Sequence, residues 1–203
     1  AILIKSIVKA MLKLLMQYFH NLGSLFSHKK PSAILYLLLI GISAILPKPL
    51  QADEVSEYGL KALFLYNFAI FTSWPGSDID KFNLCIYGDN PFGQDINFLM
   101  KSKKINERTI DIHKIDNVNQ LDQCQLVFIS RPMISNLTDV IATVKDKPIL
   151  TIADSPGACH QGVILNMNVN NEKVTFEANL MMAKKAGLNL SSQLLRLATE
   201  IYQ

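Results

Sequence analysis

Few residues of this 203-residue chain carry side chains suited to catalysis or metal binding. His113 and His160 are the only histidines after residue 28, and His160 directly follows Cys159. Adjacent residues rarely bind one metal ion together, and no CxxC or HxxxH pattern accompanies this pair, so we predict no metal site. Adjacency also fails to supply the geometry that activates a thiol nucleophile. We interpret Cys159 as a candidate redox-sensitive thiol.

Polar residues follow three apolar runs that resemble buried strands: Asp89, Ser130 and Asp154. Ligands of open parallel sheets bind at the carboxyl ends of the strands. However, the loop 88–93 lacks the glycine spacing of nucleotide-binding loops, and the chain contains neither GxxxxGK[ST] nor GxSxG. A phosphoacceptor aspartate would occupy the position where Ser130 and Arg131 stand. We therefore predict no catalytic residues and no cofactor, and we interpret Asp89 and Asp154 as solvated loop residues.

The elements that must position these residues alternate along the chain. Apolar strands that alternate with helices imply a mostly parallel sheet covered on both sides. We predict the α/β class: a doubly wound, mostly parallel, flavodoxin-like or Rossmann-like sheet with helices on both faces and strand order 2-1-3-4-5. Strands are expected at 82–88, 109–115, 125–130, 148–154, 163–169 and 173–179, and helices at 55–74, 91–101, 134–145, 180–186 and 191–202.

Two polar residues are placed to cap the first and last of these helices. Asp53 precedes the first helix, and Ser191 begins the last. The last helix is expected to bury one apolar face. That face would consist of Leu194, Leu195, Leu197, Ala198 and Ile201.

The predicted strand order has a consequence for the cysteines. It makes the strands at 82–88 and 125–130 neighbours, so Cys85 and Cys124 lie on or beside adjacent strands. A disulfide requires Cα atoms within about 7 Å. We therefore predict a bond between Cys85 and Cys124 that leaves Cys159 unpaired.

Aromatic residues on the first helix are candidates for an interface, because such residues are favoured at interface centres. Tyr66, Phe68, Phe71 and Trp74 are the candidates, and the alternative is that they belong to the core. Asn67 interrupts the apolar stretch, so we expect a buried, hydrogen-bonded amide, or alternatively a ligand contact. Glu177 stands in an apolar strand, where it serves as a structural acceptor or, alternatively, lines a pocket.

Charge is distributed unevenly along the chain. Residues 1–52 contain six lysines and no acidic residue, whereas residues 53–203 carry 14 basic and 17 acidic residues. The positive net charge of the full chain therefore comes from the N-terminal segment. The remainder lacks the excess of Lys and Arg that a nucleic-acid surface needs.

Residues 28–52 have the order of a cleaved secretory signal. A basic start is followed by the apolar run 33–46, then Pro47, Pro49 and the small residue Ala52. An uncleaved inner-membrane anchor is the alternative. Residues 1–27 are an uncertain N-terminal extension, interpreted as over-translated sequence or as an amphipathic surface helix. Residues 53–203 would then form a single periplasmic α/β domain.

Several stretches of the exported part resemble the YfiR/HmsC-type family of periplasmic proteins. The resemblance covers about residues 58–200, and its first and last blocks are the most specific. The matching pieces are KALFLYNFAIFTSWP (61–75), LCIYGDNPFG (84–93), CQLVFIS (124–130), ILTIAD (149–154), GVILNMNV (162–169), VTFEANL (174–180) and AGLNLSSQLLRLA (186–198).

The resemblance implies an α/β protein that is not an enzyme. Such a protein represses an inner-membrane diguanylate cyclase by binding its periplasmic part, which lowers cyclic di-GMP and biofilm formation. An outer-membrane lipoprotein can sequester the repressor, and a homodimer is left open. The family has two disulfides; Cys85 and Cys124 match the first, while Cys159 matches half of the second without a partner in 149–158. The alternative function is a periplasmic small-ligand binding module serving a transporter or sensor kinase.

Overall fold

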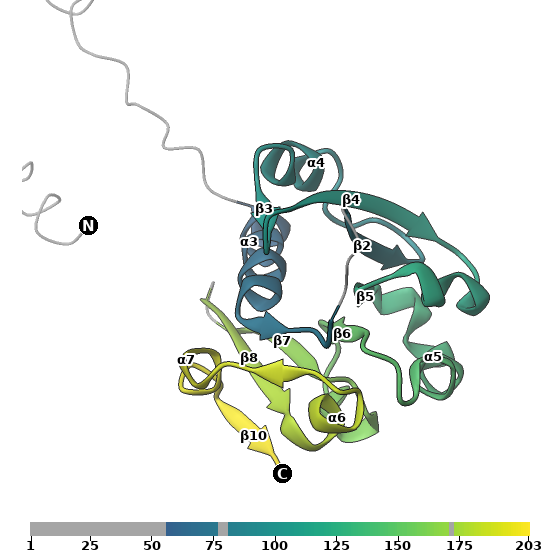
Figure 1. The fold of residues 1–203 in the computed structure, drawn as a ribbon, viewed down its shortest axis with the longest axis vertical. Helices are drawn as coiled ribbons and strands as arrows, with labels where there is room; N and C mark the ends of the chain where they lie inside the picture. Colours follow the sequence, from purple (N-terminus) through teal and green to yellow (C-terminus); the bar gives the residue numbers. More distant parts are fainter. Residues whose placement is uncertain (1–55, 77–80, 171–172) are drawn as a thin grey trace, which may run out of the picture. The chain divides into compact units, whose positions relative to one another are not determined.

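The computed structural model describes residues 56–76, 81–170 and 173–203 (Figure 1). The predicted extension at 1–27, the predicted signal at 28–52 and the predicted cap Asp53 all lie outside the described residues. Within the described part, no helix is long and apolar enough to cross a bilayer.

An eight-stranded mixed sheet forms the centre of the domain, in the order β10-β8-β7-β6-β5-β2-β4-β3. Five of its strands, β4-β2-β5-β6-β7, are parallel and follow the predicted order 2-1-3-4-5. Strand β8 runs antiparallel to β7, and β10 then pairs parallel to β8. The strands are β2 (Lys81–Tyr87), β3 (Lys104–Ile105), β4 (Arg108–Ile115), β5 (Leu126–Ile129), β6 (Leu150–Ala153), β7 (Leu165–Asn170), β8 (Lys173–Asn179) and β10 (Glu200–Tyr202).

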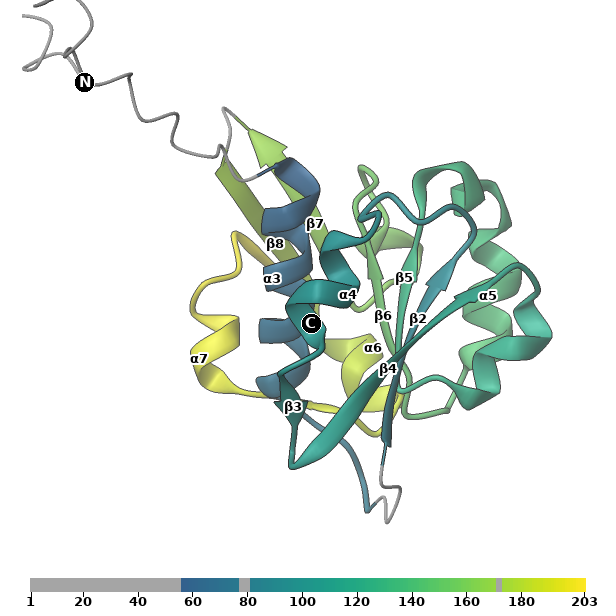
Figure 2. The same cartoon turned by 90° about the horizontal axis from the view of Figure 1, so that it is seen from above.

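Helices cover both faces of this sheet, as predicted for a doubly wound fold. Helix α3 lies on one face and α5 on the other (Figure 2). Successive residues of β2 contribute to two cores: Phe82, Leu84 and Ile86 pack on the α3 side, and Cys85 and Tyr87 on the α5 side. Side chains alternate between faces along a strand, so the central residues of a strand covered on both faces are all apolar, as Leu84, Cys85, Ile86 and Tyr87 are here. The α-helices are α3 (Glu57–Ile70), α4 (Asp95–Met100), α5 (Leu137–Val144), α6 (Leu180–Lys185) and α7 (Ser192–Leu195).

The first helix is shorter at both ends than the predicted range 55–74. Ser56 caps it, because the Ser56 Oγ accepts a hydrogen bond of 3.0 Å from the backbone N of Gly59. At the other end, β1 (Thr72–Ser73) leaves the helix and pairs with β9 (Asn189–Leu190). This short two-stranded sheet joins the end of α3 to the segment that precedes α7.

The prediction of a final helix over 191–202 is wrong beyond its first turn. Ser191 does cap α7, with its Oγ accepting from Leu194 N at 3.2 Å. The following residues instead form β10, and Leu197 and Ile201 are 70% and 37% exposed. Strand β8 offers an open edge whose backbone groups need partners, so strand pairing outweighs the helix preference of residues 200–202.

Two predicted helices also differ from the structure in extent. The segment 91–101 is helical only over α4, and the segment 134–145 begins as the 3₁₀ helix η2 (Arg131–Asn136) before α5. These boundaries place residues of η2 directly after β5, at the carboxyl edge of the sheet.

Candidate functional site

Three strand ends meet at the carboxyl edge of the sheet. Strand β2 is followed by Gly88 and Asp89, β5 by Ser130 and β6 by Asp154. The Ser130 hydroxyl donates to the backbone oxygen of Tyr87 at 2.9 Å, which ties the ends of β2 and β5 together. Asp89 is exposed, but Asp154 is only 3% exposed. The interpretation of Asp154 as a solvated loop residue is therefore wrong.

Asp154 belongs to a buried ion network with the first helix. The Nζ of Lys61 lies 2.5 Å from Asp154 Oδ2 and 2.6 Å from Glu57 Oε1. The Nε of Arg131 approaches the same Asp154 oxygen at 3.3 Å. The Lys61 ammonium also lies 4.4 Å from the centroid of the Tyr58 ring. Two basic and two acidic groups thus balance one another at this edge of the sheet.

Burial differs sharply among the members of this network. The side chain of Lys61 is 0% exposed and that of Asp154 1%, whereas those of Glu57 and Arg131 are 46% and 56% exposed. The hydrogen bond from Lys61 lowers the pKa of the Glu57 carboxyl, which favours its charged form. A buried charge is tolerated only when it is paired, so this network fixes α3 against the end of β6.

Lys61 was not predicted, although the sequence contains a signal for it. Residues 61, 65 and 68 follow helical spacing, and Leu65 and Phe68 form part of the buried stripe of α3. A lysine in an apolar stripe requires a buried acceptor. The sequence cannot name that acceptor, because Asp154 is 93 residues away in the chain.

Gly88 permits the close approach of β2 and η2 at this edge. Its φ is +87°, and a Cβ placed there would lie 2.2 Å from Met133 Cγ and 2.6 Å from Ser130 Oγ. Side chains other than hydrogen are disfavoured in this conformation. The glycine in the loop 88–93 therefore serves packing at this position.

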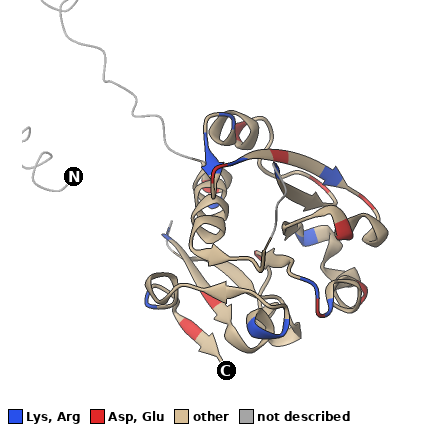
Figure 3. Ribbon diagram, viewed as in Figure 1, with Lys and Arg blue, Asp and Glu red and all other residues tan. Residues whose placement is uncertain are grey.

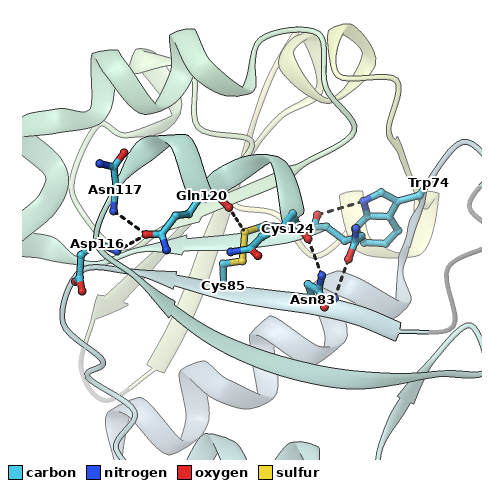
Figure 4. The surroundings of a disulfide bond; sticks show 9 residues. Trp74, Asn83, Cys85, Asp116, Asn117, Gln120 and Cys124 are labelled. Atoms are coloured by element: carbon cyan, nitrogen blue, oxygen red, sulfur yellow. Dashed lines mark hydrogen bonds between the residues drawn. A yellow bond between two sulfur atoms is a disulfide. The ribbon is translucent and has the colours of Figure 1, made fainter.

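The predicted disulfide between Cys85 and Cys124 is present, with Cα atoms 5.9 Å apart (Figure 4). It joins β2 to the residue that follows the 3₁₀ helix η1 (Val118–Gln123). Nearby polar contacts connect the same segments: Asn83 Nδ2 donates to the Gln123 carbonyl at 2.7 Å, and Asn83 N donates to Gln125 Oε1 at 2.7 Å. The bond and these contacts hold two neighbouring central strands in register.

Cys159 is unpaired and completely buried. Burial, with a smaller contribution from the charge of Glu177, raises the pKa of its thiol to about 12. The thiolate is the form that reacts with oxidants, and this environment disfavours it. Both features oppose the predicted redox sensitivity of Cys159. The neighbouring His160 is exposed, and its ring lies 4.5 Å from that of Tyr202.

The aromatic candidates on and after α3 have different surroundings. Phe68 is 1% exposed and packs on the Phe176 ring at 4.9 Å, so it belongs to the core. Trp74 is half-buried, and its Nε1 donates to the Gln125 carbonyl at 3.2 Å. The hydroxyl of half-buried Tyr66 donates to the Lys104 carbonyl at 3.3 Å. Tyr66 is thus the only one of these three with both exposure and a place on α3 itself.

Asn67 is exposed, so the expectation of a buried amide tether is wrong. Its neighbours at helical spacing, Leu63 and Ile70, are 36% and 38% exposed. Residues 63, 67 and 70 lie on one face of a helix. We call these three residues the outward face of α3.

Glu177 lies on β8, on the side of the sheet opposite Phe176. Its Oε1 accepts a hydrogen bond of 2.7 Å from Asn168 Nδ2, while its Oε2 is buried without a hydrogen-bond partner. In the parallel register of β8 and β10, Glu177 stands beside Glu200. Glu177 therefore lies on the side of the sheet opposite α3, and it does not form one surface with the aromatic candidates of that helix.

The residues described contain no group of three or more His, Cys, Asp or Glu side chains that could hold a metal ion. At the carboxyl edge, the Asp154 carboxylate and the Ser130 hydroxyl are both held in internal contacts. The arrangement can anchor a helix and fix two strand ends. The fold and this site define a disulfide-bonded α/β domain whose first helix is held to the sheet by an ion network. One face of that helix points outward.

The comparison with protein families identifies the relatives of this domain. The YfiR/HmsC-like family model matches residues 58–199, which span every strand of the sheet except β10. The chain belongs to the YfiR/HmsC-like family. The match begins within α3, so Lys61 and the outward face lie inside the family region.

Three solved structures are similar to part of this chain at low sequence identity. A conserved domain protein from Vibrio cholerae has a TM-score of 0.44 and 9% identity over 71% of this chain and 60% of that one. The ligand-free, open structure of CD0873, a substrate-binding protein with adhesive properties from Clostridium difficile, has a TM-score of 0.45 and 14% identity. The match covers 71% of this chain and 59% of that one. An ABC domain in complex with L-Trp from Streptococcus pneumonia has a TM-score of 0.41 and 10% identity. The match covers 60% of this chain and 56% of that one. This chain thus corresponds to less than two thirds of each structure.

Proposed function

We propose that this chain is a periplasmic, non-enzymatic regulator that represses an inner-membrane diguanylate cyclase by binding its periplasmic part. The repressed cyclase makes less cyclic di-GMP, and biofilm formation falls. An outer-membrane lipoprotein that sequesters the regulator would relieve the repression. The observation that carries this proposal is the match to the YfiR/HmsC-like family over residues 58–199.

Two features of the chain support export as part of the proposal. The segment 28–52 has the order of a secretory signal. The Cys85–Cys124 disulfide suits an oxidising compartment such as the bacterial periplasm. Both features agree with a regulator that meets the outer part of a membrane enzyme.

The outward face of α3 supports binding to another protein. Helix α3 is apolar around most of its circumference, and such a helix is usually covered on all sides. In the described part of the chain, Leu63 and Ile70 nevertheless remain more than one third exposed. We assign this face to the contact with the cyclase, with half-buried Tyr66 at its border.

Deletion of the gene tests the regulatory proposal in cells. Cyclic di-GMP and biofilm mass should rise in the deletion strain and return to the starting level when the wild-type gene is restored. An unchanged cyclic di-GMP level, in a strain whose wild-type protein is exported normally, would argue against the proposal.

Variants of the outward face test the binding surface. Leu63→Glu/Ile70→Glu places two charges on this face and should weaken binding to the purified periplasmic part of the cyclase by at least about tenfold, as expected when central apolar contacts are lost. Leu197→Glu is the matched control, because Leu197 is also exposed but lies after α7. Equal binding by the wild type and the double variant would remove α3 from the interface.

A further inference from the structure

A second region of interest lies at the opposite edge of the sheet from the Asp154 network. There a cavity of about 350 Å³ opens between α5 and α6, at the amino ends of β6 and β7. This volume lies in the range of small-molecule sites, which are about 300–1,000 Å³. The apolar residues of its lining come from both helices and from the segments leading into the strands: Ile141, Val144, Ile149, Ile164, Met182 and Ala186.

The cavity results from the way in which β6 and β7 separate. Their ladder begins only at the pair Ile152 and Leu165, so the preceding residues diverge. At this point Ile164 N donates to the side-chain oxygen of Thr151 at 2.9 Å instead of to a strand partner. Gly162, with φ +103°, then turns the chain beside Ile141, where an added Cβ would lie 3.1 Å from Ile141 Cγ2. The hydrogen bond to Thr151 and the backbone conformation of Gly162 therefore keep the cavity open between the starts of β6 and β7.

Charged residues at the border of the cavity favour an anion. Lys145 and Lys185 line it from the ends of α5 and α6, and Asp146 is the one acidic residue of the lining. Neither lysine takes part in an ion pair with another described residue. Lys184 is a second lysine of α6, although it does not line the cavity, and Figure 3 shows part of this helix in blue. The cavity thus combines apolar walls with unpaired cationic side chains.

We propose that this cavity binds a small monocarboxylate with an apolar body. The apolar body would lie against Ile141, Ile164 and Met182, and the carboxylate would pair with Lys185 and Lys145 at the border. The inference goes beyond the proposed function and does not require it, because it rests on the cavity alone. The combination of apolar walls with few polar groups is typical of ligand sites.

Titration of the exported protein with octanoate tests the proposal. Binding is followed by NMR, with resonances of Ile141, Ile164 and Met182 expected to shift. Hexanoate should bind more weakly by roughly fourfold for each methylene removed, because each buried CH₂ contributes a constant share of the affinity. Octylamine, which has the same chain and the opposite charge, should bind at least about fivefold more weakly than octanoate.

Variants then locate the site. Ala142→Trp fills the mouth from an exposed position on α5 and should abolish octanoate binding. Ala186→Phe fills the mouth of the cavity from the residue that ends α6 and should also abolish octanoate binding. It provides the test if Ala142→Trp does not fold. Lys185→Gln should weaken octanoate binding by about two- to fivefold. Lys101→Gln is the matched control, since Lys101 is exposed and lies at the end of α4, and it should leave binding unchanged.

Three results would overturn this inference. The first is the absence of saturable octanoate binding by the folded wild-type protein. The second is equal affinity for octanoate and octylamine, which would assign the lysines no role. The third is octanoate binding that persists in a folded Ala142→Trp or Ala186→Phe protein, because the ligand would then occupy another place. None of these results depends on cyclase regulation, so failure here leaves the proposed function to its own test.

Discussion

Replacement of Lys61 by methionine gives the sharpest test of the buried ion network. Methionine approximates the apolar stem of lysine but lacks the ammonium, which leaves the Asp154 carboxylate 1% exposed with its Oδ1 already unpartnered. Loss of one partner from a buried ion pair costs about 3–5 kcal/mol of unfolding free energy. Arg131 remains 3.3 Å from Asp154 Oδ2 and offsets part of this loss, so we expect about 3 kcal/mol.

Urea unfolding of the purified protein measures this change. For a domain of this size, about 3 kcal/mol corresponds to a fall in melting temperature of roughly 6–12 °C. Lys61→Met/Asp154→Leu should recover most of the lost stability, since a buried pair can be replaced by apolar residues at little cost.

The reasoning would be refuted if the stability of Lys61→Met lay within about 1 kcal/mol of the wild type, because a buried carboxylate that keeps only the partly exposed Arg131 as its partner should cost more than that. It would also be refuted if the double variant lost the sum of the two single losses. Independent sites add in this way, whereas members of one ion pair do not.

Three further predictions concern the cysteines and the glycine turn. Removal of the disulfide by Cys85→Ala/Cys124→Ala should cost about 3–4 kcal/mol in urea unfolding, and a reductant should destabilise the wild type but not this variant. Cys159 should resist iodoacetamide at pH 8 in the folded protein and react after unfolding, because a pKa of about 12 leaves only about 10⁻⁴ of the thiol ionised. Rapid labelling of Cys159 in the native state would contradict its burial. Gly88→Ala should cost about 2–4 kcal/mol, whereas Gly93→Ala, which has positive φ and open space, should cost about 1 kcal/mol; equal losses would show that backbone strain alone matters.

The strand order could be predicted because its determinants are local. Each apolar run is long enough for one strand, and the connections between parallel strands have a fixed hand, so few arrangements are possible. The neighbours β2 and β5 followed from this order, and the position of the disulfide followed from those neighbours. The fold class and the covalent link were thus contained in short-range patterns.

The features that sequence reasoning missed depend on partners distant in the chain. Helical spacing marked residue 61 as buried, but only the folded sheet brings Asp154 to it. The segment 200–202 has helical character by itself and becomes β10 because the edge of β8 accepts it. Asn67 was assigned to the interior because its neighbours are apolar, although α3 exposes one apolar face.

The position of Lys61 has a consequence for how the chain acquires its structure. Helix α3 emerges early, but its ionic partner follows 93 residues later, and its aromatic partner Phe176 follows later still. Contacts of such high sequence separation form slowly, and apolar segments that wait for them are prone to aggregate. A chain that emerges N-terminus first therefore holds an unshielded apolar helix until nearly all of the sheet has been made. New molecules should consequently depend on holding chaperones during this interval, and truncated ones should be degraded.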